Sequence, residues 1–262
     1  MDSDIRRFAE ALERAERILF VTGAGLSSAS GLPTYRGLGG LYNGHTEEGL
    51  PIERVLSGPM LRQRPELCWK YLAELGRACL VAQPNRAHLA IAELQRRKPG
   101  CWLLTQNIDG LHRAAGSPDA QTVEIHGRLS PLFCMQCGRE DLQLVEHLQR
   151  PLPPRCGSCE GVLRPPVVLF EEMLPGTALE TLWQQMAQGF EVVVAVGTTA
   201  SFGYIAEPFR QARQRGALTV EINPEPTVLS GFVDLRLNGA ALDIFDAALG
   251  HTLIDRICKS ES

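Results

Sequence analysis

The sequence has 262 residues, of which 44% are hydrophobic and 21% charged, a composition typical of one soluble domain or of one domain carrying an insertion. The formal net charge is −4, so no basic field is present to hold nucleic acid. No apolar run is long enough to span a membrane, and residues 1–16 lack the apolar core of a signal peptide. We therefore expect a cytoplasmic protein whose eight cysteines are reduced thiols or metal ligands.

Short apolar runs alternate with amphipathic segments along the chain. The amphipathic segments, typical of helices, cover residues 5–15, 65–81, 85–97, 179–188, 205–215 and 243–253. The apolar runs, typical of buried strands, cover residues 18–21, 102–105, 123–125, 167–170, 192–196, 218–222 and 233–237. Buried strands that alternate with helices predict an α/β fold with a parallel, doubly wound, Rossmann-like sheet.

Two stretches interrupt this alternation. Residues 39–84 begin in a Gly-rich loop over 38–50 and continue into a helix, whereas residues 130–163 hold four Cys and four Pro with little periodicity. We therefore expect a main domain in three pieces, with 39–84 as a helical insertion and 130–163 as a metal-binding module. The pieces of the main domain are residues 1–38, 85–129 and 164–262.

The cysteine-rich stretch carries two C-x-x-C pairs, Cys134–Cys137 and Cys156–Cys159, separated by eighteen residues. Two such pairs at this separation are typical of a tetrahedral thiolate site for one Zn²⁺. Four sulfur ligands leave no open position, so the metal would be structural. A redox dithiol or an iron–sulfur cluster is the alternative, but a redox pair needs one C-x-x-C at a helix start and not two.

A Gly-rich turn follows the first predicted strand. Gly23-Ala24-Gly25 lets the backbone approach a phosphate closely, yet Ser28 stands where the third glycine of the usual dinucleotide-binding pattern would be. A tight strand-to-helix turn without a ligand is the alternative at this point.

Polar residues also follow the later strands, at the edge where doubly wound sheets bind ligands. Gln106, Asn107 and Asp109 come after residues 102–105, and His126 comes after 123–125. His112 is the other histidine of this region and a second candidate for a catalytic base.

Several of these segments resemble motifs of the sirtuin family. Residues 23–37 resemble its cofactor-loop signature, GAG-x-S-x-x-SGIP-x-[FY]-R, and residues 105–112 and 126–127 resemble its TQNIDGLH and HG motifs. Gly197-Thr198-Thr199 is similar to its GTS motif, with Thr in place of Ser. The likeness extends over residues 5–250. It implies an NAD-dependent protein-lysine deacylase that consumes NAD as a co-substrate and contains one structural zinc ion.

The resemblance also assigns residues to this activity. The implied NAD-binding residues are Gly23, Ala24, Gly25, Ser27, Tyr35, Arg36, Gln106, Asn107, Asp109, Gly197, Thr198, Thr199, Asn223 and Ala241. Within the implied mechanism Asn107 and Asp109 orient ribose, nicotinamide and a water, and His126 is the general base, with His112 in the supporting motif. The implied products are free lysine, nicotinamide and 2′-O-acyl-ADP-ribose.

The substrate side shows three departures from the family pattern. The segment Val167, Val168, Leu169 and Phe170 resembles the one that pairs with an acyl-lysine peptide, but Glu171 replaces the family Gly. Residues 200–204 are expected to form a longer loop than in the family. The Tyr-x-x-Arg pair of desuccinylating members is absent, since Leu72 and Leu75 align there. We therefore expect acetyl or another neutral acyl group as the substrate.

Two other functions are compatible with these features. One is an NAD glycohydrolase or ADP-ribosyltransferase on the same fold, which the Glu171 departure keeps open. The other is a non-catalytic NAD sensor, against which the set of Asn107, Asp109 and His126 argues. The sequence leaves the protein substrate and the oligomeric state undetermined.

Overall fold

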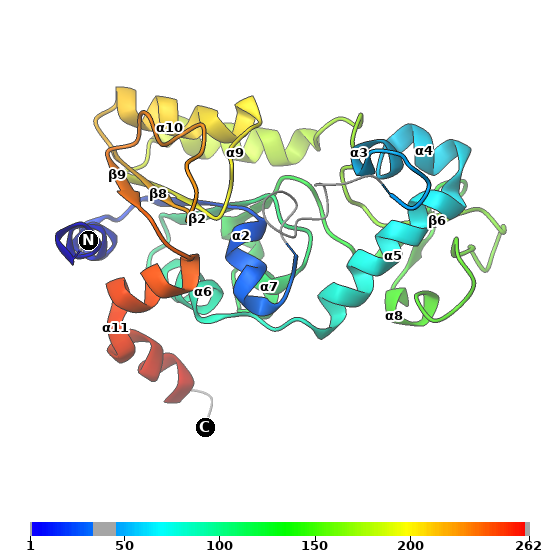
Figure 1. The fold of residues 1–262 in the computed structure, drawn as a ribbon, viewed down its shortest axis with the longest axis horizontal. Helices are drawn as coiled ribbons and strands as arrows, with labels where there is room; N and C mark the ends of the chain where they lie inside the picture. The colour runs from blue at the N-terminus through cyan, green and yellow to red at the C-terminus, as the bar shows by residue number, and fades with distance from the viewer. Residues whose placement is uncertain (1, 34–45, 260–262) are drawn as a thin grey trace.

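The computed structural model describes residues 2–33 and 46–259 and has two lobes (Figure 1). The larger lobe is built on a six-stranded parallel sheet, and the smaller lobe is formed by the helical insertion and the cysteine-rich stretch. The predicted parallel, doubly wound α/β sheet is therefore confirmed. Across the sheet the order is β3 (Thr122–Glu124), β2 (Cys101–Thr105), β1 (Ile18–Thr22), β7 (Val192–Val196), β8 (Leu218–Ile222) and β9 (Leu235–Leu237).

Helices cover both faces of the sheet, which explains why its central strands β1 and β7 are apolar at nearly every position. Ile18 and Phe20 of β1 point toward one helical layer, and Leu19 and Val21 point toward the other, because successive side chains alternate. The first layer contains α1 (Asp2–Arg14), α6 (Arg86–Arg97) and α11 (Ala241–Lys259), which breaks at Gly250. The second contains α9 (Gly176–Gln188) and α10 (Gly203–Gln214).

The smaller lobe has a hydrophobic core of its own, to which both insertions contribute. The helical insertion supplies α3 (Ile52–Val55), α4 (Gly58–Gln63) and α5 (Pro65–Val81). The cysteine-rich stretch supplies α8 (Leu144–His147) and a small antiparallel sheet of β5 (Glu140–Asp141), β4 (Leu132–Cys134) and β6 (Leu163–Arg164). Trp69 of α5 is fully buried here and donates its indole N–H to the Leu163 carbonyl at 2.8 Å.

One predicted strand is wrong. Residues 167–170 belong to no sheet and form only isolated bridges, Val167 with Gly127 and Phe170 with Ser57. The segment is extended and crosses between the lobes, because Val168 N–H bonds to the His126 carbonyl at 2.9 Å and Phe170 N–H to the Leu56 carbonyl at 3.0 Å. Burial between two lobes produces the same apolar run as burial in a sheet.

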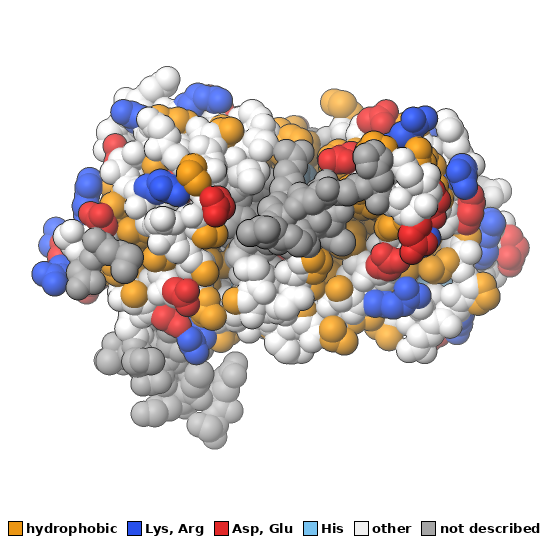
Figure 2. All heavy atoms as spheres, in the orientation of Figure 1, with side chains coloured by type: hydrophobic (Ala, Val, Ile, Leu, Met, Phe, Trp, Pro, Cys, Tyr) orange, Lys and Arg blue, Asp and Glu red, His pale blue; other side chains and the backbone are white. Residues whose placement is uncertain are grey.

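Several short elements carry no sequence signal of their own, among them α2 (Ala24–Ser27), α7 (Leu111–Ala114) and the 3-10 turns at Ser28–Ser30 and Asp119–Gln121. Within the described residues no helix is long and apolar enough to cross a membrane. On the face shown in Figure 2, the described acidic and basic side chains are interspersed and form no continuous basic surface.

Candidate active site

The candidate site lies at the carboxyl ends of β1, β2 and β7, beside the point where the strand order changes direction. Two turns meet there: Gly23-Ala24-Gly25 after β1 and Gly197-Thr198 after β7. Gly25 N–H donates to the Gly197 carbonyl at 2.9 Å. A Cβ on Gly25 would lie 2.8 Å from Gly197 Cα, and a Cβ on Gly197, whose φ is +59°, would lie 2.3 Å from Leu26 N. Glycines are therefore required for the two turns to pack together, whether or not a phosphate binds.

Polar side chains after β2 form a hydrogen-bonded group with the first turn. Asp109 accepts a bond from Ser27 Oγ at 2.7 Å and one from Leu111 N–H at 2.9 Å. Asn107 Nδ2 donates to the Gly23 carbonyl at 3.1 Å and to Ser27 Oγ at 3.2 Å. Burial raises the pKa of Asp109, although both of its hydrogen bonds oppose this. The structure thus brings Ser27, Asn107 and Asp109 together.

A buried histidine that the sequence did not single out joins this group. His88 of α6 is fully buried, and its Nε2 lies 3.4 Å from Ser27 Oγ. Its Nδ1 accepts a bond from Asn85 N–H at the start of the helix, so Nε2 carries the proton and donates. Burial lowers the pKa of His88 to about 4. Its only sequence signal is a polar residue on the buried face of a helix.

His112 is buried as well, and its ring meets that of His88 edge-on with centroids 4.9 Å apart. Thr22 Oγ1 donates to Thr105 Oγ1 at 2.9 Å, so the 3.0 Å contact of Thr22 with His112 Nε2 must be donated by the imidazole. Nδ1 is then the unprotonated nitrogen, and it has no partner among the described residues. Burial lowers the pKa of His112 well below its usual range.

His126 occupies a different environment, at the end of β3. Its Nδ1 lies 3.0 Å from the Gln106 carbonyl, which can only accept, so Nδ1 carries the proton. Nε2 is then the basic nitrogen, and Tyr204 donates its hydroxyl to it at 2.8 Å. Burial lowers the pKa of His126, and the bond to Gln106 opposes this only in part. The imidazole is therefore neutral at neutral pH.

The remaining predicted NAD residues lie along the same edge. Gln106 Nε2 donates to Thr198 Oγ1 at 2.7 Å, and Asn223 Nδ2 donates to the backbone carbonyl of Thr198 at 3.2 Å, so both side chains are anchored on Thr198. Thr199 is exposed and lies 2.9 Å from Ser201 Oγ. Ala241 is buried in the core at the start of α11. Tyr35 and Arg36 lie outside the described residues.

A pocket opens beside this group. Its polar lining includes Ser27, Asn107 and Asp109, and its apolar lining includes Leu75 and Cys79 of α5. Asn107 Oδ1 is buried without a hydrogen-bond partner among the described residues. A buried acceptor in this state suits a ligand that brings a donor, such as an amide N–H.

The expected acyl-selecting positions on α5 are only partly as predicted. Leu72 is buried in the core of the small lobe and does not line the pocket, whereas Leu75 does. Tyr71 points toward residues 47 and 48, where its hydroxyl donates to Glu48 at 2.7 Å. Arg77 donates to the Leu148 carbonyl at 2.8 Å, which directs its guanidinium into the small lobe.

The segment expected to contact the substrate is held by an ion pair. Arg164 donates to both carboxylate oxygens of Glu172, at 2.6 and 2.9 Å, and to the Val167 carbonyl at 2.7 Å. Glu172 also accepts from Leu169 N–H at 2.9 Å. Burial opposes ionisation of Glu172, but these bonds outweigh it and lower its pKa. Glu171 adopts a φ of +65°, so the backbone keeps the left-handed conformation that glycine favours.

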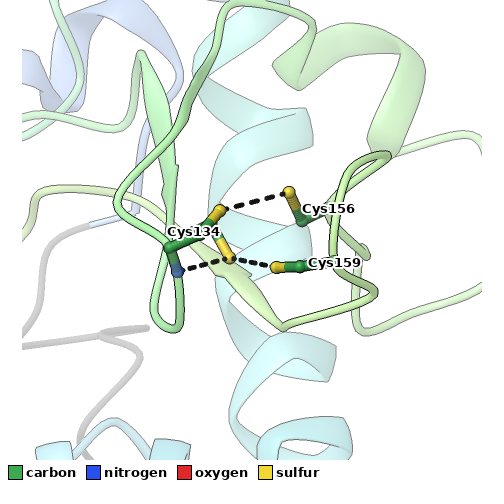
Figure 3. A group of neighbouring side chains, drawn as sticks. Cys134, Cys156 and Cys159 are labelled. Carbon is green, nitrogen blue, oxygen red and sulfur yellow. Dashed lines mark hydrogen bonds between the residues drawn. The ribbon is translucent and has the colours of Figure 1, made fainter.

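The four predicted metal ligands form one cluster. Cys134, Cys137, Cys156 and Cys159 place their sulfurs within 4.8 Å of one another, and Figure 3 shows the labelled sulfurs turned inward from two loops. The separations are 3.5 Å for Cys134–Cys159 and 3.8 Å for Cys137–Cys156. Zn–S bonds of about 2.3 Å in a tetrahedron require sulfurs about 3.8 Å apart. Backbone N–H groups of Gln136 and Ser158 point at two of the sulfurs, as suits thiolates. The cluster therefore fits one structural zinc ion.

Comparisons with known proteins agree with this geometry. The model of the Sir2 family matches residues 23–202. The chain is 64% identical over 249 residues to "NAD-dependent protein deacylase 2" of Pseudomonas aeruginosa, covering 95% of this chain and 97% of that one.

Two solved structures are similar throughout. A Sir2 homologue in complex with NAD is 33% identical with a TM-score of 0.80, covering 98% of this chain and 94% of the other. A Sir2 complex with a p53 peptide and NAD+ is 25% identical with a TM-score of 0.82, covering 95% and 99%. This chain therefore belongs to the Sir2 family, the sirtuins.

Proposed function

We propose that this chain is an NAD-dependent protein deacylase that acts preferentially on acetyl-lysine and releases nicotinamide and 2′-O-acyl-ADP-ribose. The observation that carries the proposal is the tautomer of His126, which the Gln106 carbonyl fixes so that Nε2 is basic, directly before the Asn107 and Asp109 side chains that join the glycine turn and Ser27. The high identity to a curated deacylase supports the same conclusion. The test is mass spectrometry of the products formed from NAD and an acetyl-lysine peptide. Free ADP-ribose alone would indicate a glycohydrolase, and unchanged NAD would indicate a sensor.

NAD would lie across the paired glycine turns, with its nicotinamide in the pocket beside Asn107. NAD would supply an electrophilic ribose carbon and a good leaving group. Asn107 would offer Oδ1, which has no partner among the described residues, to a carboxamide N–H. Asp109 is held by Ser27 where it can orient a water or a ribose hydroxyl. Thr198 and Asn223, which are linked at the β7 and β8 ends, would contact the adenosine half.

His126 is proposed as the general base and His112 as a structural residue. His126 has its basic nitrogen directed away from the backbone carbonyl that fixes its tautomer. His112 is fully buried, and its Nε2 proton is donated to the Thr22 hydroxyl at the end of β1. As nicotinamide leaves, the acyl-lysine oxygen would bond to the ribose carbon. A ribose hydroxyl would then lose its proton toward His126 as it attacks the acyl carbon, whose double bond to the lysine nitrogen opens. The lysine nitrogen would take up a proton and leave as the free amine.

The peptide would pair with the extended segment Val167–Phe170, which bonds to the sheet lobe at Val168 and to the small lobe at Phe170. The Arg164–Glu172 pair fixes the end of this segment. Glu171 replaces the family glycine with a larger side chain, but its φ of +65° is in the left-handed region that a glycine would favour at this position.

The acetyl preference is supported by the apolar end of this same pocket, which would take the acyl chain next to the nicotinamide. That end presents Leu75 and Cys79 of α5, while Arg77 donates its hydrogen bond to the Leu148 carbonyl. A succinyl carboxylate would be buried there with no cation among the described residues that line the pocket, which costs several kcal/mol in effect. We expect kcat/KM for acetyl peptide to exceed that for the matched succinyl peptide by at least about tenfold, or about 1.4 kcal/mol. Equal or faster desuccinylation would refute this, and Arg77→Ala would then show whether Arg77 is the missing cation.

A cytoplasmic location is also part of the proposal. It is supported by the thiolate cluster, since a reducing compartment keeps such cysteines available for zinc. Fractionation of cells that express the chain tests it.

A further inference from the structure

The hydroxyl of Tyr204 occupies the position at which the proposed base must receive its proton. Because His126 Nδ1 is bonded to the Gln106 carbonyl, Nε2 has the only lone pair that can accept. Tyr204 already donates to that lone pair at 2.8 Å, a distance typical of a well-formed hydrogen bond. A ribose hydroxyl must therefore either displace the phenol or pass its proton through it.

The surroundings of Tyr204 favour the second route, because they hold the phenol in place. Its ring is stacked on Phe202, with centroids 5.5 Å apart and planes 13° apart, and both rings meet the His126 ring edge-on. Tyr204 is in the first turn of α10, and the next residues, Ile205 and Ala206, are buried in the core beneath the sheet. The half-buried ring packs against that same core.

We infer that Tyr204 is a catalytic residue that relays the proton between the ribose hydroxyl and His126. The ribose O–H bond breaks and its proton bonds to Tyr204 Oη, while the Tyr204 O–H bond breaks and that proton bonds to His126 Nε2. The electron pair left on the ribose oxygen forms the new bond to the acyl carbon, and the π electron pair between that carbon and the lysine nitrogen moves onto the nitrogen. Tyr204 is neutral before and after the transfer, and His126 becomes the cation.

Concerted transfer agrees with the chemistry of this phenol. Burial raises the pKa of Tyr204 to about 12, so a free phenolate would be costly and the hydroxyl stays protonated at working pH. A relay in which both protons move together never forms that phenolate. The inference rests on the proposed function, because it assigns a step of the same reaction.

The test compares Tyr204→Phe, which keeps the ring and its stacking, with Phe202→Leu, which removes the stacking partner and keeps the hydroxyl. In the free protein, the ¹⁵N resonance of His126 Nε2 should shift in Tyr204→Phe because a hydrogen-bond donor is lost. Single-turnover deacylation by Tyr204→Phe should fall by at least about tenfold, within the range that a proton-transfer group contributes. Exchange of labelled nicotinamide into NAD, which precedes the proton transfer, should stay near the wild-type rate.

The outcomes separate the alternatives. Deacylation by Tyr204→Phe at or above the wild-type rate would overturn the relay and show that ribose displaces the phenol. Equal losses of exchange and deacylation would also overturn it, since they indicate a structural role. An unchanged ¹⁵N resonance would show that the hydrogen bond is absent in solution. A wild-type protein with neither exchange nor deacylation would refute the proposed function itself.

Discussion

Acid destabilisation through His88 provides a quantitative test of the buried network at the site. The folded protein holds this imidazole neutral, with a pKa of about 4, whereas the unfolded chain protonates near 6.5. Below pH 6.5 the imidazole therefore binds a proton in the unfolded state but not in the folded state, so the free energy of unfolding decreases as the pH falls. The decrease ends below pH 4, where the imidazole is protonated in both states. At pH 5 this difference amounts to about 2 kcal/mol relative to pH 8.

The perturbation is His88→Gln, whose amide nitrogen can still donate toward Ser27 but does not titrate. The variant should be less stable than the wild type at pH 8, because Asn85 N–H loses its acceptor. We call the difference in free energy of unfolding between the two proteins the gap. The gap should narrow by about 2 kcal/mol between pH 8 and pH 5, because only the wild type contains the histidine whose protonation favours the unfolded state. Urea unfolding of both proteins at four pH values, with equal zinc, measures the gap, and zinc loss affects both alike.

A gap that stays constant from pH 8 to pH 5 would refute the reasoning, because His88 would then titrate equally in both states. A gap that widens toward acid would show that the folded protein protonates this imidazole first. The measurement needs no substrate, so it examines the network beneath Ser27 independently of catalysis.

Three further changes have definite expected outcomes. Cys134→Ala should release the zinc and unfold the small lobe, because the metal supplies much of the folding free energy of that lobe. Elemental analysis measures the metal content, and iron or no metal in folded wild-type protein would contradict the prediction. His126→Ala should lower the deacylation rate by about 10²–10⁴-fold while NAD still binds. Steady-state kinetics measures the rate and calorimetry measures NAD binding, and near-normal turnover would mean that another group is the base. Glu172→Gln should cost about 1–3 kcal/mol of stability and raise KM for peptide, because Arg164 and Leu169 lose a charged partner. The exposed neighbour Glu171→Gln is its control and should change neither value by much.

Local signals carried most of what the sequence predicted correctly. The run at 192–196 is apolar because both faces of β7 are covered, and two C-x-x-C pairs need no knowledge of the fold to indicate zinc. The apolar run at 167–170 was misleading, since an extended segment buried between two lobes has the pattern of a buried strand.

The missed residues depend on contacts that no local pattern encodes. His88 reaches Ser27 only because α6 packs under the first turn, 61 positions away in sequence. Tyr204 reaches His126 across 78 positions, from a segment that the sequence marked only as a departure from the family. Periodicity places a residue on the face of an element, but it does not say which distant element meets that face.

The shared core of the small lobe determines how this protein can be recombined with its relatives. Residues 130–163 are contiguous in sequence, so they could be replaced as one segment by the matching residues of a relative. Half of the buried core beneath them comes from residues 52–73 of the helical insertion. Within α5, Trp69 bonds to the Leu163 carbonyl, Arg77 bonds to the Leu148 carbonyl, and a Cβ on Gly76 would lie 3.1 Å from Leu148. A chimera that transplants only the cysteine-rich piece would set foreign side chains against this helix. The transferable unit is therefore discontinuous, and a viable hybrid has to take residues 46–81 from the same parent.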